Sequence, residues 1–280
     1  MPAVAAARQL ASHAGDTAGA DDAFRRAAQS ATRDRERFEV VGWRALAAVM
    51  GPTPVDEAIA RCEQLREQVL SSPLALASTL NPLALLHAMK GELETAERLL
   101  EDAGAILRER DGLTSGVSHL AASVRLLSGR PELAEASLRA SLPLTSEGSA
   151  LATTTALLAQ AVFAQGRYGE AAELCETANR HAAPGDTVTQ AIWRGVRAKV
   201  LALEGGCGKA EALAREAVRL AEPTDLLSCR GDAWLDLAGV LRACGRGEEA
   251  DRATLEALEL YDRKGNARAR SLIDHPQGGT

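Results

Sequence analysis

The stretch AQAVFAQGRYGEAAELCETA, residues 159–178, carries the pattern that decides the fold of this 280-residue chain. It places a glycine at position 166, alanines at positions 159, 171 and 178, and apolar residues between them at helical spacing. A glycine takes the left-handed conformation that ends a helix at low cost, and small residues let two helices pack closely. The stretch therefore predicts two antiparallel helices joined by a tight turn at Gly166.

The same pattern recurs along the chain. Six copies nearly in phase have a glycine followed by an alanine five residues later. Their glycines, together with Gly51 of a divergent copy, stand 36 to 40 residues apart. Self-similarity at such a period is typical of a solenoid of stacked helix pairs. We expect the glycines at helix ends and the alanines where paired helices approach most closely. These structural positions are Gly15, Gly91, Gly129, Gly166, Gly205, Gly245, Ala20, Ala96, Ala134, Ala171, Ala210 and Ala250.

Composition and charge narrow the class of protein. Ala, Leu, Arg and Glu dominate, which favours helices, and the formal net charge is −6. Basic and acidic residues are interleaved, so binding to nucleic acid is disfavoured. The longest uncharged run, residues 68–89, is interrupted by prolines, Asn81 and His87, which predicts a buried helix rather than a membrane span. We see no signal-peptide pattern at the N-terminus.

The five cysteines, Cys62, Cys175, Cys207, Cys229 and Cys244, include no Cys-x-x-Cys pair and have no histidine at metal-ligand spacing. We therefore expect reduced thiols packed as small core residues, a cytoplasmic location and no metal site. The segment GGCGK at 205–209 lacks the first glycine and the final Ser or Thr of a phosphate-binding loop. No catalytic triad or acid pair is recognisable, so we predict no catalytic or cofactor-binding residues and no enzyme activity.

Trp193, Arg194 and Arg197 form the most distinctive local cluster. The tryptophan is either an anchor for a partner or packing between repeats, and packing is favoured. The two arginines are three residues apart and so share one face of a helix. We expect both arginines at the surface.

The small–glycine–small pattern, with Phe24 four residues after Ala20, resembles the tetratricopeptide repeat (TPR) family. Three segments sharpen the resemblance: GPTPVDEAIARCEQL at 51–65, TQAIWRGVRAKVLALEG at 189–205 and ALELYDRKGNARAR at 257–270. They are similar to the C-terminal TPR region of actinobacterial adenylate/guanylate cyclase–AAA ATPase signalling proteins, over residues 20–273. A looser similarity extends to ATP-binding transcriptional regulators of the maltose-regulator type, whose helical tails sense inducers.

The resemblance implies an all-α, right-handed superhelical solenoid of about seven antiparallel helix pairs in one domain, residues 1–273. The repeats begin at the N-terminus without a recognisable cyclase or ATPase segment, so the chain is expected to be a detached regulatory tail. The expected pairs lie near 1–33, 34–70, 73–111, 113–144, 147–183, 186–222 and 225–263, before a short capping helix and a disordered tail at 274–280.

In this fold the first helices of the pairs line the concave surface, which is the default binding site. Fixed positions before each repeat glycine fall on the exposed side of the first helix, and their residues predict a mostly neutral groove. Such a groove has too few cations to clamp a carboxylate and suits a helix or a neighbouring domain better. We therefore predict a non-catalytic scaffold for bacterial signal transduction, with a protein or peptide partner or a second copy of itself. The alternative is a small-molecule-sensing domain of an ATP-dependent transcriptional regulator. The predicted groove residues are Asn81, Leu85, Met89, His119, Ser123, Gln160, Phe163, Lys199 and Arg242.

Overall fold

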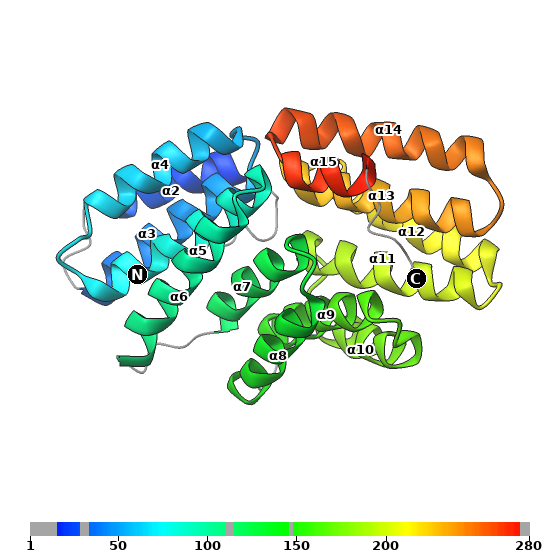
Figure 1. The fold of residues 1–280 in the computed structure, drawn as a ribbon, viewed down its shortest axis with the longest axis horizontal. Coiled ribbons are helices and arrows are strands. Elements are labelled where there is room, and N and C mark those ends of the chain that lie inside the picture. The colour runs from blue at the N-terminus through cyan, green and yellow to red at the C-terminus, as the bar shows by residue number, and fades with distance from the viewer. Residues whose placement is uncertain (1–15, 29–33, 110–114, 146–147, 275–280) are drawn as a thin grey trace. The chain divides into compact units, whose positions relative to one another are not determined.

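The computed structural model describes residues 16–28, 34–109, 115–145 and 148–274. Within these ranges every regular element is a helix, and paired helices run antiparallel (Figure 1). The fold is therefore all-α and TPR-like, as predicted. The helices are α2 (Thr17–Ala28), α3 (Asp34–Met50), α4 (Val55–Glu67), α5 (Pro73–Lys90), α6 (Leu93–Glu109), α7 (Ser115–Leu127), α8 (Pro131–Ser141), the 3-10 turn η1 (Leu142–Leu144), α9 (Gly148–Ala164), α10 (Tyr168–His181), α11 (Thr187–Leu203), α12 (Cys207–Ala221), α13 (Leu227–Ala243), α14 (Gly247–Lys264) and α15 (Ala267–Asp274).

Glycines of the repeat pattern stand at the turns between paired helices. After α9, the N–H groups of Gly166 and Arg167 donate to the carbonyls of Phe163 and Val162, which closes the last turn of the helix. This geometry needs a positive φ at the glycine, and φ of Gly166 is 78°. Four other glycines of the pattern have φ from 72° to 88°: Gly91, Gly129, Gly205 and Gly245.

Some predicted positions lie outside the described residues. They are Gly15, the start of the first expected pair at 1–33, and residues 275–280 of the expected tail. The six alanines of the pattern are all described, and each has no exposed surface. In the pair α9–α10, both Ala159 and Ala171 belong to one buried core cluster, so the small residues stand on either side of a helix crossing.

The helices group into two compact units. Unit 1 comprises residues 1–113 and 261–280, and unit 2 comprises residues 114–260. The last residues of α14 and the whole of α15 therefore pack with the N-terminal helices, although they follow unit 2 in the sequence. The single domain expected over 1–273, with its seven repeat boundaries, stays a prediction.

In unit 1, the buried face of α2 packs on α3 through Phe24 and Val40, and Phe24 stacks on Trp43 with ring centroids 5.8 Å apart. The uncharged run forms α5, which contacts α3, α4, α6 and α15. Contacts with four other helices explain why α5 is apolar on nearly every side. None of the described helices is both long enough and apolar enough to cross a membrane.

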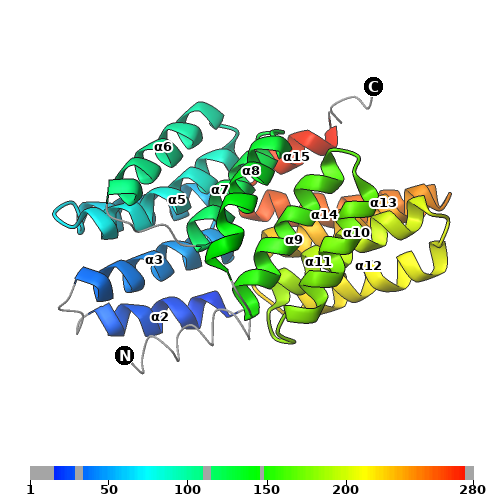
Figure 2. The ribbon, with the colours of Figure 1, turned by 90° about the horizontal axis from the view of Figure 1, so that it is seen from below.

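In unit 2, the first helices of successive pairs contact each other as well as their own second helices. Helix α9 contacts α7 and α11, and α11 contacts α13. Figure 2 shows α9 and α11 side by side, with α10 and α12 as their second helices. This arrangement brings side chains from α7, α9, α11 and α13 onto one continuous face of unit 2, which we call the first-helix face.

Candidate functional site

The predicted groove residues divide between the two units. Asn81, Leu85 and Met89 lie on α5 in unit 1 and are only 3%, 5% and 4% exposed. They are therefore core residues in this structure. The other six lie on the first helices of unit 2: His119, Ser123, Gln160, Phe163, Lys199 and Arg242. That all nine line one groove stays a prediction.

Polar side chains join each first helix of unit 2 to the next. His119 Nε2 on α7 lies 2.7 Å from Thr154 Oγ1 on α9, and Ser123 donates to the carbonyl of His119. The hydroxyls of Thr153 on α9 and Thr189 on α11 lie 2.8 Å apart. These partly buried hydrogen bonds have defined geometry, so they set how successive first helices align.

Lys199 on α11 contacts side chains from two neighbouring first helices on this face. Its Nζ donates to Asp236 Oδ1 on α13 at 2.6 Å and lies 4.9 Å from the centroid of the Phe163 ring on α9. Phe163 also contacts Tyr168, with ring centroids 5.1 Å apart. We call Phe163, Tyr168, Lys199 and Asp236 the Phe163 cluster. It draws residues from three consecutive helix pairs into one place, although only Phe163 and Lys199 were predicted.

Gly195 makes room for this cluster. A Cβ at Gly195 would lie 1.8 Å from Asp236 Oδ2, so any other residue would displace the carboxylate from its place beside Lys199. The glycine is buried in the middle of α11, where a glycine normally weakens a helix. Its position is therefore explained by the close approach of Asp236 from α13.

The two cations of the predicted groove are both paired with carboxylates. Lys199 is held by Asp236, and the exposed Arg242 bonds to Asp251 at 3.0 Å. Gln160 differs, because its half-buried side chain makes no hydrogen bond to any residue in the described ranges. Around Phe163 the first-helix face therefore offers an amide and aromatic surface. Its two predicted cations are already paired, Lys199 with Asp236 on α13 and Arg242 with Asp251 on the second helix α14.

Burial lowers the pKa of His119 to about 4. The imidazole is consequently neutral near pH 7 and engaged with Thr154. A general base that works near neutral pH needs a pKa close to 7. His119 is a packing and hydrogen-bonding residue in this arrangement.

The depressed pKa of His119 predicts a pH dependence of stability. Because the folded state holds the proton less tightly than the unfolded chain, whose histidine titrates near 6.5, stability present above pH 6.5 is lost as the pH falls toward about 4. We expect a loss of about 2 kcal/mol over this range. Urea titrations at several pH values should show a steeper acid slope for the parent than for His119→Gln. Equal slopes would mean that the imidazole is accessible to protons in the folded state.

Trp193 is packing between repeats, as the sequence favoured. It is 6% exposed, belongs to the core of unit 2, and donates from Nε1 to Gln190 at 3.0 Å. The expectation for Arg194 and Arg197 was wrong, because their side chains are only 14% and 23% exposed. Arg194 lies over the indole ring, 4.2 Å from its centroid, so the tryptophan draws the guanidinium down onto the core.

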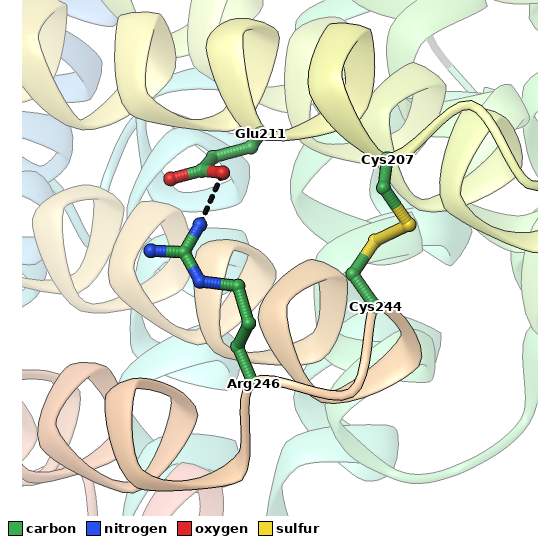
Figure 3. The surroundings of a disulfide bond; sticks show 4 residues. All are labelled: Cys207, Glu211, Cys244 and Arg246. Atoms are coloured by element: carbon green, nitrogen blue, oxygen red, sulfur yellow. Dashed lines mark hydrogen bonds and ion pairs between the residues drawn. A yellow bond between two sulfur atoms is a disulfide. The ribbon is translucent and has the colours of Figure 1, made fainter.

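The expectation of five reduced thiols was wrong for two cysteines. Cys207, the first residue of α12, and Cys244, at the end of α13, form a disulfide with their Cα atoms 5.7 Å apart (Figure 3). Their separation of 37 residues is close to one repeat period, so the repeat itself brings two equivalent turns together. That spacing was the signal in the sequence that could have found the pair.

The other three cysteines match the expectation. Cys62, Cys175 and Cys229 are free and buried. Burial raises the pKa of Cys62 and of Cys175 to about 12, and it raises the pKa of Cys229 further. Thiols with raised pKa values carry almost no thiolate at neutral pH and are poor nucleophiles.

A charged network that the sequence analysis missed occurs twice between second helices. In each copy, one second helix supplies a Glu six residues and an Arg ten residues after its repeat glycine. The next second helix supplies an Arg one residue and a Glu four residues after its own repeat glycine. The pair α10 and α12 lacks it, because Ala172 and Gly206 occupy two of these positions. Figure 3 shows one contact of the second network beside the disulfide. The networks are Glu135, Arg139, Arg167 and Glu170 between α8 and α10, and Glu211, Arg215, Arg246 and Glu249 between α12 and α14.

In the second network, each carboxylate lies beside an arginine, so opposite charges stabilise each other. Hydrogen bonds from Arg215 and Arg246 hold the pKa of Glu211 below its usual value. These side chains are largely at the surface, where ion pairs add little to stability. In both copies they connect one second helix to the next.

No family model and no curated protein sequence matches the chain. Solved structures are similar to it. One is the APC/C hetero-tetramer Cut9-Hcn1, with 11% identity, a TM-score of 0.71, and coverage of 99% of this chain and 53% of that chain, or about half its length. Another is the Rap protein complexed with the Competence and Sporulation Factor, with 13% identity, a TM-score of 0.59 and coverage of 90% and 78%. A third is NprR in complex with its cognate peptide NprX, with 13% identity, a TM-score of 0.56 and coverage of 90% and 76%. At these identities the likeness is one of fold, a TPR-like array of helix pairs.

Proposed function

We propose that the chain is a non-catalytic interaction module that binds a protein or peptide segment on the first-helix face of unit 2. The observation that carries the proposal is the Phe163 cluster together with Gln160. Tyr168 is 43% exposed and Phe163 is half-buried, so aromatic surface is available next to an amide without a partner among the described residues. Aromatic side chains that are already held in place lose little entropy on binding and often anchor a partner.

The chemistry of this face favours a segment with an apolar side chain and hydrogen-bonding groups. The ammonium of Lys199 is engaged by Asp236 and Phe163, so capturing a carboxylate there would require breaking an existing ion pair. A helix or extended peptide that lays apolar groups on Phe163 and reaches the amide of Gln160 requires no such exchange. Among proteins of similar fold, NprR is seen with its cognate peptide NprX, which supports a peptide-sized partner here.

The resemblance of residues 51–65, 189–205 and 257–270 supports a more specific role. We infer from it that the module is a regulatory, cytoplasmic part of a bacterial signalling system of the cyclase–ATPase type. This part of the proposal depends on the sequence resemblance, whereas the binding face depends on the contacts in unit 2. The signalling role and the binding face can therefore be tested separately.

Affinity capture with the whole chain as bait tests the binding face. From lysate of the source cell, the parent should retain a defined protein, or a second copy of itself, that the double variant Gln160→Ala and Phe163→Ala no longer retains. Leu255→Ala is the matched control, because Leu255 is an apolar side chain, 66% exposed, on the second helix α14. The control should capture as the parent does.

Thermal melting of all three proteins shows whether the variants are folded. If the double variant is folded and retains the partner as well as the parent does, the first-helix face is not the binding surface. Light scattering on the purified parent distinguishes a second copy from a different protein.

A further inference from the structure

Unit 1 contains a cleft of about 570 Å³ that the proposed function does not use. Its residues come from α2, α3 and α4, from the turn between α3 and α4, and from Gln68 directly after α4. The three helices can be followed in Figure 1. Helices α2 and α4 each contact α3, so α3 provides the floor of the cleft and the other two provide its walls. The volume falls within the range of small-molecule sites, which is roughly 300–1,000 Å³.

Arg44 stands on the floor of this cleft and has unused hydrogen-bonding capacity. Its Nε donates to Asp21 Oδ1 at 3.1 Å, and its side chain is 21% exposed. The two terminal nitrogens of the guanidinium have no partner among the described residues. A guanidinium edge of this kind matches the paired oxygens of a carboxylate or phosphate.

Two more arginines stand on the walls. Arg25 on α2 pairs with Asp22 at 2.7 Å, and Arg61 on α4 pairs with Glu57 at 2.8 Å. Arg25 is 62% exposed and Arg61 is 49% exposed, so both can turn toward a ligand. The lining itself holds three arginines and two carboxylates, and Glu57, the partner of Arg61, lies outside it. The carboxylates of Asp21 and Asp22 can accept hydrogen bonds from hydroxyl or amino groups.

The end of the cleft is held from two sides. Thr17 packs so closely on Gly51 that a Cβ at Gly51 would lie 2.1 Å from Thr17 Oγ1. From the other side, the buried ammonium of Lys264 donates to the carbonyls of Ala48, Gly51 and Thr53. Ala48 and Thr53 line the cleft themselves, so its shape is set before any ligand enters.

We infer that this cleft binds a small polar molecule that carries a carboxylate or phosphate group, with Arg44 as the principal contact. The anionic group lies on the Arg44 guanidinium edge, and Arg61 closes on it from α4. Hydroxyl or amino groups of the same molecule donate to Asp21 and Asp22. The site belongs to unit 1 alone and is independent of the first-helix face of unit 2.

Calorimetric titration of the full chain tests the site, with inorganic phosphate and succinate as two separate probes at constant ionic strength. At least one probe should bind the parent saturably below 20 mM, and the difference between them identifies phosphate or carboxylate as the preferred group. Arg44→Gln should weaken binding by about tenfold or more, because a charge-assisted hydrogen-bond pair is lost. Arg44→Lys keeps the charge but not the paired donors, and should be intermediate.

Two further variants keep the result interpretable. Arg61→Gln changes a largely exposed wall residue and should also weaken binding without unfolding the chain, even if Arg44→Gln disturbs α2. Arg98→Gln, which removes the same charge from an exposed site on α6, should bind as the parent does. Absence of saturable binding for both probes, or equal affinity in Arg61→Gln and Arg98→Gln, would overturn the proposal.

Discussion

Opening the Cys207–Cys244 disulfide should lower the free energy of unfolding by about 4 kcal/mol. The bond closes a loop of 37 residues, and a cross-link of that span removes loop-closure entropy from the unfolded chain. In the folded state it ties the first residue of α12 to the end of α13, beside the contact of Glu211 with Arg246. Urea titration of the parent with and without a phosphine reductant measures the loss.

The variant Cys207→Ser with Cys244→Ser provides the control. It should unfold at the midpoint of the reduced parent, and the reductant should not shift it further. Cys62, Cys175 and Cys229 remain in this variant and are buried, so they should stay unreactive toward thiol reagents until the chain unfolds. If the reductant does not shift the urea midpoint of the parent, the two sulfurs are not joined.

Because disulfides persist mainly in oxidising compartments, the redox state of Cys207 and Cys244 in protein extracted from the cell also tests the predicted cytoplasmic location.

Replacing Lys264 with methionine should cost about 3 kcal/mol, since three carbonyls would be left without their donor. Lys264 has no exposed surface, and its Nζ donates to the carbonyls of Ala48, Gly51 and Thr53 at 3.1, 2.7 and 2.8 Å. Two of these carbonyls belong to the last turn of α3 and the residue after it, where a helix leaves carbonyls unpaired and a cation is favourable.

Arg263→Met is the neighbouring control, because Arg263 precedes Lys264 in the same helix but is exposed. It should change the free energy of unfolding by no more than about 0.5 kcal/mol. Hydrogen exchange in α15 gives a second readout, since Lys264→Met should release residues 267–274 more readily. If Lys264→Met and Arg263→Met have the same free energy of unfolding and the same hydrogen exchange in α15, the Lys264 contacts do not hold residues 267–274 in place.

Features with a local physical cause were predicted correctly from the sequence. A glycine that must reach positive φ after a helical run marks a turn wherever it occurs, and Gly91, Gly129, Gly166, Gly205 and Gly245 all do so. The alternation of such turns with Ala-rich helical runs was enough to predict an all-α repeat fold. The same reasoning placed Trp193 in packing between repeats and Cys175 among the inert thiols.

Roles that depend on neighbours in space were not predictable from the sequence. Arg194 and Arg197 were expected at the surface because both are charged and share a helix face. Arg194 instead lies over the indole of Trp193, and both arginine side chains are less exposed than the carboxylates that they pair with. Asn81, Leu85 and Met89 occupy the repeat positions of groove residues, yet α5 is surrounded by four helices and buries them. Position in a repeat predicts which way a side chain faces, and not what lies opposite it.

The sequence by itself determined the helical class, the repeat period and the turns, because each follows from conformational preferences within one helix pair. Only the tertiary structure decided that Cys207 meets Cys244, that Lys199 lies between Phe163 and Asp236, and that Lys264 bonds to carbonyls more than 200 residues away in the chain. These contacts require the distance between separate helices, which no local preference encodes. The repeated helix pairs could therefore be predicted from the glycines and alanines, whereas the disulfide, the lysine contacts and the cleft depend on how the helices pack.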